Sequence, residues 1–208
     1  YHDIMREERL QSQRDRQTLQ SLISDISHQV KTPVANVKLY AGILKRQDIP
    51  EEKRIQFSDS MEAQINKLDF LMQSLIKMSR LETGTFALNP VESRLIDTIA
   101  QAMNTVWGKA EQKEIEISVA CGSEITVRHD PKWTAEAIGN LLDNAVKYTQ
   151  AGGKVSITVR PWQFYTRIDI SDTGIGISKE HYNDVFQRFY REEKVAAEEG
   201  IGLGLYLA

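Results

Sequence analysis

The sequence predicts a two-domain α+β protein: an antiparallel helical hairpin that forms a dimeric four-helix bundle, followed by an α/β-sandwich domain. Residues 1–46 contain one proline and one glycine and carry apolar side chains at helical spacing. A second such stripe follows a break at residues 47–50. Beyond Gly84 and Pro90 the pattern changes to short segments and turns, typical of mixed helix and strand. The predicted domains are therefore residues 1–83 and 84–208.

The two apolar stripes are too wide for a single helical hairpin to bury. A second copy of the hairpin would cover them by two-fold symmetry, so we expect a homodimer. In the alternative interpretation, the stripes only cover the second domain. The stripes consist of Leu19, Leu22, Ile23, Ile26, Val30, Val34, Val37 and Leu44, and of Ile55, Met61, Ile65, Leu68, Met72, Leu75, Met78 and Leu81.

The second domain should alternate helices with short strands. Apolar periodicity predicts helices at residues 91–108 and 132–148, and short strands at residues 114–120 and 125–128. Two further alternating segments, residues 154–160 and 166–171, predict a β-hairpin.

The composition excludes several classes of function. With 41% apolar and 26% charged residues in 208, the chain can form a packed core, and its net charge of −3 gives no electrostatic footprint for nucleic acid. Cys121 is the only cysteine, which excludes an intrachain disulfide and a cysteine-based zinc site. No apolar run approaches the ~18 residues of a bilayer span, so we expect no membrane segment in this chain.

A histidine lies in the first predicted helix, within residues 27–33 (Ser-His-Gln-Val-Lys-Thr-Pro). Helical spacing places Asp25, His28 and Thr32 on one face, so that an acid, an imidazole and a hydroxyl cluster. Pro33 removes a backbone hydrogen bond and is expected to bend the helix and expose the histidine. The alternative is a surface histidine beside an incidental kink.

A second polar constellation lies on the predicted helix at residues 132–148. Asn140, Asn144 and Lys147 share one face. Amide oxygens can bind a hard magnesium ion, and an ammonium group can contact phosphate. We therefore expect an anionic, metal-bound ligand beside this helix.

Two glycine-rich segments complete the pattern. Asp172, Gly174 and Gly176 follow a predicted strand, where glycines let the backbone approach a ligand and the carboxylate can accept from an exocyclic amine. The second segment precedes a predicted helix start, so its amides could bind phosphate. Each segment alone is a weak indicator, because a Gly-x-Gly is usually only a turn. The second segment contains Gly200, Gly202 and Gly204.

In their order and spacing, these motifs resemble the sensor histidine kinases of two-component signalling, over nearly the whole chain. Residues 27–33 resemble the family's phosphoacceptor box, and residues 140–148 its N box. Its G1, F and G2 boxes are matched by residues 172–176, 186–189 and 200–204.

The resemblance implies a dimerisation and phosphotransfer hairpin followed by a Bergerat-type ATP-binding domain that uses ATP and Mg²⁺. It implies autophosphorylation of His28 and transfer of the phosphoryl group to an aspartate of a response regulator receiver domain. Asn144 would be the principal magnesium ligand, with Asn140 nearby and Lys147 on phosphate. Tyr148 would pack by the adenine. The resemblance also implies that the nucleotide is bound by Asp172, Gly174, Gly176, Gly200, Gly202 and Gly204.

The chain departs from the family pattern in two places. An acidic residue usually follows the phosphoacceptor, but Gln29 stands there and cannot take a proton. Slower autophosphorylation is therefore expected, unless Asp25 supplies the charge. The chain also ends at Ala208, where family members continue, so an incomplete ATP-binding domain is expected. Thr32 occupies the position of a hydroxyl or amide in family members that also dephosphorylate their partner, although it could simply bond back to the helix.

Two other classes of function stay open. Bergerat-type ATPases such as gyrase hydrolyse ATP to drive conformational change, and the histidine motif argues against them. A weakly catalytic dimerisation module could instead bind nucleotide only to switch shape. Gln29 and the expected truncation favour this alternative, and the intact phosphate motifs oppose it. The resemblance further implies that this piece is cytoplasmic and that the full-length protein is anchored in the cell membrane by segments preceding Tyr1.

Overall fold

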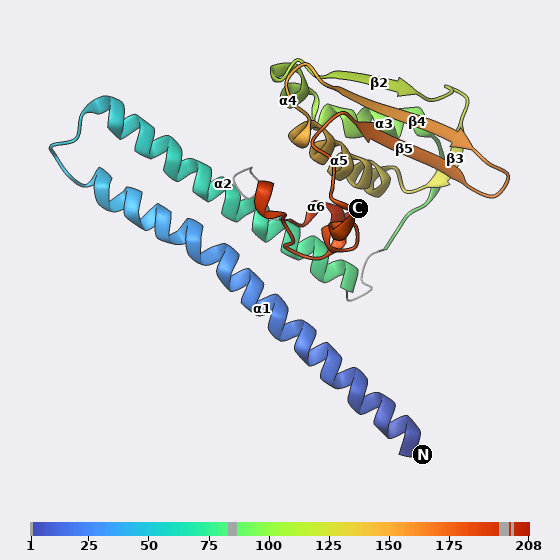
Figure 1. The fold of residues 1–208 in the computed structure, drawn as a ribbon, viewed down its shortest axis with the longest axis horizontal. Coiled ribbons are helices and arrows are strands. Elements are labelled where there is room, and N and C mark those ends of the chain that lie inside the picture. The colour runs from blue at the N-terminus through green and yellow to red at the C-terminus, as the bar shows by residue number, and fades with distance from the viewer. Residues whose placement is uncertain (1, 83–86, 196–199, 201) are drawn as a thin grey trace. The chain divides into compact units, whose positions relative to one another are not determined.

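The computed structural model describes residues 2–82, 87–195, 200 and 202–208 (Figure 1). These residues fall into two compact units, Tyr1–Ile76 and Lys77–Ala208. The expected domain boundary between residues 83 and 84 lies outside the described residues. None of the helices in the described part combines the length and apolar character that a bilayer span requires.

A helical hairpin forms the first unit, as predicted. Its helices are α1 (His2–Leu44) and α2 (Glu51–Glu82), and α2 continues into the second unit. The turn is fixed by the guanidinium of Arg54, which donates to the carbonyl oxygen of Leu44 at 3.2 Å. Tyr40 and Phe57 stack across the hairpin with ring centroids 5.9 Å apart. The helices are therefore held together at the end nearest the turn.

Pro33 lies inside α1 without ending it. Helix α1 is assigned without interruption through this position, and the proline ring is fully buried. The proline at which a bend was expected therefore does not end the helix. His28 is nevertheless exposed, in agreement with the expectation.

An α/β sandwich forms the second unit, as predicted (Figure 1). Its larger sheet has the order β2-β4-β5, with β2 (Glu116–Ala120) parallel to β4 (Lys154–Pro161). Strand β5 (Thr166–Asp172) pairs antiparallel with β4 and completes the predicted hairpin. Helices α3 (Leu95–Asn104) and α5 (Pro131–Tyr148) contribute to the same core as β4.

The core follows from the two sequence periods. In β4 every second side chain is buried, which gives Val155, Ile157 and Val159 to one face of the sheet. Helix α5 contributes Ile138 and Leu142 to the same core at helical spacing. The opposite, polar face of α5 is thereby oriented away from the core.

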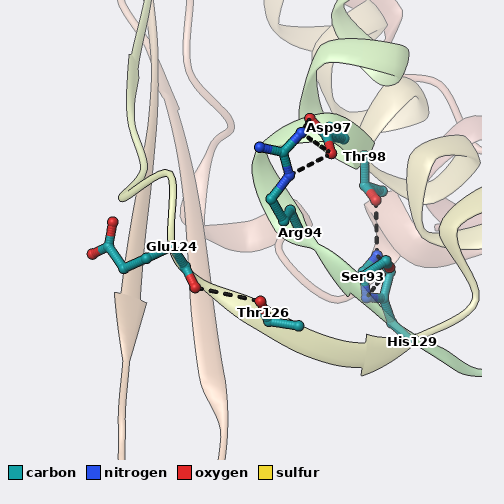
Figure 2. Close-up of polar contacts among 7 residues, drawn as sticks. All are labelled: Ser93, Arg94, Asp97, Thr98, Glu124, Thr126 and His129. Carbon is teal, nitrogen blue, oxygen red and sulfur yellow. Dashed lines mark hydrogen bonds and ion pairs between the residues drawn. The ribbon is translucent and has the colours of Figure 1, made fainter.

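The helix predicted at residues 91–108 is wrong at its start and near its end. Strand β1 (Val91–Arg94) pairs antiparallel with β3 (Thr126–His129), and the chain between α3 and α4 (Trp107–Gln112) breaks the expected helix. The partner strand supplies backbone hydrogen bonds that no local pattern reveals. Figure 2 shows the consequence: the ring of His129 on β3 meets Ser93 on β1 and Thr98 on α3.

Candidate functional site

The predicted acceptor residues all lie on α1, within the first unit. His28 and Thr32 are exposed, and Asp25 and Gln29 are half-buried. The hydroxyl of Ser21 donates to Oδ2 of Asp25 at 3.5 Å, one turn before the histidine. An exposed imidazole with a carboxylate and a hydroxyl on the same helix is accessible to an incoming electrophile.

Helix α5 carries the second predicted group, and both of its ends are anchored. At the start, Oδ1 of Asp130 accepts from the amide of Trp133 at 3.1 Å, and Oδ2 accepts from the amide of Asn89 at 2.8 Å. These two backbone donors lower the pKa of the Asp130 carboxyl, the Asn89 amide most strongly. The cap therefore fixes where α5 begins.

Lys113 anchors the other end of α5. Its ammonium donates to the carbonyl oxygens of Val146, Lys147 and Thr149 at 3.0, 2.7 and 2.9 Å. These carbonyls lie at the helix C-terminus, where no further turn supplies donors. Lys113 thus holds the last turn of α5, which bears the predicted phosphate and adenine residues.

One face of α5 presents the amides of Asn140 and Asn144 and the ammonium group of Lys147, and all three residues are half-buried. Lys147 donates to the hydroxyl of Tyr148 at 3.0 Å, and its Nζ lies 4.6 Å from the centre of that ring. Nδ2 of Asn140 is buried and has no hydrogen-bond partner among the described residues. An acceptor brought by a ligand would satisfy this amide.

The segment that leads into α6 (Gly204–Leu207) approaches the same face of α5. A Cβ atom at Gly200 would lie 2.8 Å from Nζ of Lys147, and one at Gly204 would lie 3.7 Å from Nδ2 of Asn144. Gly202 has φ +77°, and its carbonyl accepts from the amide of Phe189 at 2.8 Å. The structure therefore brings the predicted amide, ammonium and glycine residues together.

The first glycine segment lies against the end of α5. A Cβ atom at Gly174 would be 2.6 Å from the carbonyl oxygen of Tyr148, so only glycine fits. The amide of Gly174 donates to Oδ1 of Asp172 at 2.8 Å, and the Asp172 side chain is exposed at the end of β5. Gly176 has φ +66° and open space around it.

The residues beside α5 fit a magnesium ion that is bound together with phosphates. Among the residues that the structure describes, no group of three or more His, Cys, Asp or Glu side chains could hold a metal. Magnesium, however, usually keeps several waters and takes only one or two protein ligands when phosphates complete its shell. The amide oxygens of Asn144 and Asn140 could supply those ligands.

Sequence reasoning missed the two residues that anchor α5. The dipeptide of Asp130 and Pro131 is a typical helix start and could have identified the cap. For Lys113 no local signal exists, because its partners lie more than thirty residues away in sequence.

The fold combines a helical hairpin with an α/β-sandwich domain, and both match known families. The model of the His Kinase A (phospho-acceptor) domain matches residues 18–84, and that of the histidine kinase-, DNA gyrase B- and HSP90-like ATPase matches residues 129–208. The chain belongs to the sensor histidine kinases of two-component systems.

Individual relatives agree with this assignment. The sensor-like histidine kinase SenX3 of Mycolicibacterium smegmatis is 32% identical over 193 residues, which cover 92% of this chain and 50% of the relative. The sensor protein kinase PmrB of Pseudomonas aeruginosa is 30% identical over 188 residues, covering 88% of this chain and 38% of the relative. The chain thus spans half or less of the length of these curated relatives.

Two solved structures support the fold. The histidine kinase AdeS of Acinetobacter baumannii superposes with a TM-score of 0.70 at 23% identity, covering 86% of this chain and 83% of that one. The histidine kinase ThkA, solved in complex with the response regulator protein TrrA, gives a TM-score of 0.72 at 19% identity, covering 89% and 55%.

Proposed function

We propose that the chain is the catalytic portion of a sensor histidine kinase that phosphorylates itself on His28 and passes the phosphoryl group to an aspartate of a response regulator. The observation that carries the proposal is the close approach of Gly200 to Lys147 and of Gly204 to Asn144. A backbone segment, an ammonium group and side-chain amides thus lie close together, and all three can contact an anionic, metal-bound ligand.

The described contacts support specific roles toward ATP. The Lys147 ammonium would offset phosphate charge, and Tyr148 would pack against the base. The exposed carboxylate of Asp172 would accept from the adenine amino group. Gly174 lets the chain pack against the Tyr148 carbonyl, and open space surrounds Gly176. Asn144, with Asn140 beside it, would ligate Mg²⁺, which stabilises charge on the transferring group when bound.

His28 would act as the nucleophile. A neutral imidazole has a free lone pair on one ring nitrogen, and this lone pair can attack phosphorus. A bond forms between this nitrogen and the γ-phosphorus as the bond from phosphorus to the β–γ bridging oxygen breaks, releasing ADP. The proton on the other ring nitrogen then leaves, and Asp25 is the carboxylate nearest in sequence that could take it.

A labelling experiment tests the proposal. The chain is incubated with Mg²⁺ and ATP labelled on the γ-phosphate, alongside His28→Ala and, as a matched control on the same helix, His2→Ala. We expect acid-labile, alkali-stable label in the wild type and in His2→Ala, and none in His28→Ala. Undiminished label in His28→Ala would exclude His28 as the acceptor, whereas tight ATP binding without any label would favour a nucleotide switch.

We also propose that Thr32 supports removal of phosphate from the partner. Its exposed side chain lies four residues from His28 on the same helix, where a hydroxyl can position a water molecule. We expect Thr32→Ala to slow the loss of label from a phosphorylated receiver domain. Thr32→Ser keeps the hydroxyl and should dephosphorylate the receiver domain at about the wild-type rate. Dephosphorylation by Thr32→Ala at the wild-type rate would exclude this role.

We propose that the hairpin dimerises. Ile26, Val30 and Val34 line a groove along α1, and Ile65 and Met72 are exposed on α2. A second hairpin would cover this apolar surface, and two copies would complete a four-helix bundle.

Sedimentation equilibrium of two separate variants tests the dimer. One variant places a charge in the apolar groove of α1, and the other places a charge outside it. We expect Val34→Asp to dissociate the dimer, and Leu39→Asp, an exposed residue of α1 that is not part of the groove lining, to leave it intact. A wild-type monomer, or dissociation by both variants equally, would contradict the proposal.

The proposed partner is a response regulator receiver domain, which the solved complex of ThkA with TrrA supports by analogy. The phosphorylated chain should transfer its label within seconds to one member of a panel of receiver domains and slowly to the others. We further propose a cytoplasmic location for this part of a membrane-anchored protein, as in the family.

A further inference from the structure

The turn between β4 and β5 presents an unusual set of aromatic side chains. Trp162, Phe164 and Tyr165 are 58%, 89% and 58% exposed, although residues of this kind are normally covered. They lie within four consecutive positions at the tip of a two-stranded hairpin that extends from the sheet (Figure 1). Contiguous apolar surface of this kind usually marks an interaction site.

The tip is held in one conformation. The amide of Trp162 donates to the carbonyl oxygen of Tyr165 at 2.8 Å, which closes the turn. The rings of Trp162 and Tyr165 stack with centroids 5.7 Å apart and an interplanar angle of 9°. Little side-chain entropy is therefore lost when these two rings bind a partner.

Two arginines flank the aromatic tip at opposite positions of the hairpin. Arg160 and Arg167 are register partners, and their side chains are 61% and 57% exposed. Like charges placed directly opposite each other repel. Asp169 offsets them only in part, because it bonds Nε of Arg167 at 2.7 Å but lies 3.9 Å from Nε of Arg160. The tip keeps a net positive charge.

We propose that this aromatic tip, residues 160–167, binds the surface of an anionic lipid bilayer. Tryptophan and tyrosine rings favour the boundary between headgroups and acyl chains, where Phe164 would insert deepest because it is the most exposed. Arg160 and Arg167 would bind lipid phosphates, which relieves their mutual repulsion.

Shape and charge argue against other occupants. Self-association of two tips would bring four guanidinium groups together, which is unfavourable. A folded protein partner typically needs ~800 Å² on each side, whereas three partly exposed rings offer on the order of 400 Å² on a convex tip. A bilayer accepts a small convex protrusion, because its headgroups rearrange around the inserted rings.

The proposal is tested by sedimentation of the 208-residue chain with vesicles, independently of any kinase activity. Vesicles of phosphatidylcholine alone are compared with vesicles that also contain the anionic lipid phosphatidylglycerol. We expect binding to the anionic vesicles, weakened by salt, and a partition coefficient lowered roughly 10-fold or more in Phe164→Ser, because an inserted ring is lost. Trp107→Ser is the matched control, since Trp107 is also an exposed tryptophan of the second unit at 54%.

A second pair of variants separates charge from apolar insertion. The double variant of Arg160→Gln and Arg167→Gln should lose the preference for anionic vesicles, and thermal unfolding of each variant checks that the fold is intact. Tryptophan fluorescence should shift to shorter wavelength on binding in Trp107→Ser but not in Trp162→Phe. Failure of the wild type to bind, equal binding to both vesicle types, or equal losses in Phe164→Ser and Trp107→Ser would each overturn the proposal.

Discussion

A Cβ atom added to Gly200 would lie 2.8 Å from Nζ of Lys147. The backbone at Gly200 also has φ +131°, a conformation that residues with a side chain rarely adopt. The φ angle favours glycine at residue 200, and an added side chain would also displace the flexible end of Lys147. This one position therefore controls both the path of the segment before α6 and the space around Lys147.

Replacing Gly200 with alanine should weaken nucleotide binding. The strain of the unfavourable φ angle is on the order of 1–3 kcal/mol, and Lys147 must move away from its position. We expect the dissociation constant for an ATP analogue, measured by calorimetry with Mg²⁺, to rise about 10-fold. Gly108→Ala is the control, because nothing lies within 4 Å of its added Cβ atom. Equal affinities for the Gly200 variant and the wild type would contradict this prediction.

Replacing Lys113 with methionine should destabilise the second unit. The change removes the donor to three carbonyl oxygens at the end of α5 while keeping most of the side chain. Hydrogen bonds that involve a charged group contribute about 1.5–3 kcal/mol, so we expect a loss of that order in the free energy of unfolding, measured in urea. Lys109→Met removes only an exposed ion pair to Asp143 and should cost less than ~1 kcal/mol. Equal effects of the two variants would show that Lys113 does not act through the helix end.

The position after His28 should limit the rate of autophosphorylation. Gln29 can orient the imidazole but cannot take its proton, and a positioned base typically contributes ~10²- to 10⁴-fold. We expect Gln29→Glu to raise the initial rate of labelling by at least about 10-fold. Asp25→Asn should lower the rate, because it removes the carboxylate that shares a face of α1 with His28. No gain from the first variant and no loss from the second would rule out this explanation.

The Asp130 cap of α5 should make the thermal stability of the second unit depend on pH. Because the backbone amides of Asn89 and Trp133 lower the pKa of Asp130, its contribution is complete above the ordinary Asp pKa of about 4 and is lost as pH falls through the lowered value. The melting temperature of the wild type should therefore exceed that of Asp130→Asn by a margin that shrinks below pH ~4. A margin that stays constant between neutral and acidic pH would contradict this.

Elements with a strong period of their own were predictable from the sequence. The apolar stripes of α1 and α2 predicted the helical hairpin. The alternation of apolar and polar residues around Val155 and Ile157 predicted strand β4, which pairs with β5. The motif residues Asn144 and Lys147 were likewise visible because they are three apart on one helix. Local spacing determines these features, so no knowledge of distant contacts was needed.

Features that depend on distant partners were not predictable. Strand β1 forms because β3 lies beside it, and residues 91–94 have no strong strand pattern that would reveal this. The parallel pairing of β2 with β4 and the bonds from Lys113 join segments that are far apart in sequence. The approach of Gly200 to Lys147 also required the folded chain, since more than fifty residues separate them.

The lysine that caps α5 has an electrostatic consequence for the anion expected beside it. A helix carries partial negative charge at its carboxyl end, which ordinarily repels phosphate, and Lys147 lies in that last turn. Because the Lys113 ammonium neutralises these carbonyl dipoles, they do not offset the positive charge of Lys147, whose ammonium donates to the neutral Tyr148 hydroxyl. An end of a helix that would otherwise favour cations is thereby converted into one that can receive a polyanion.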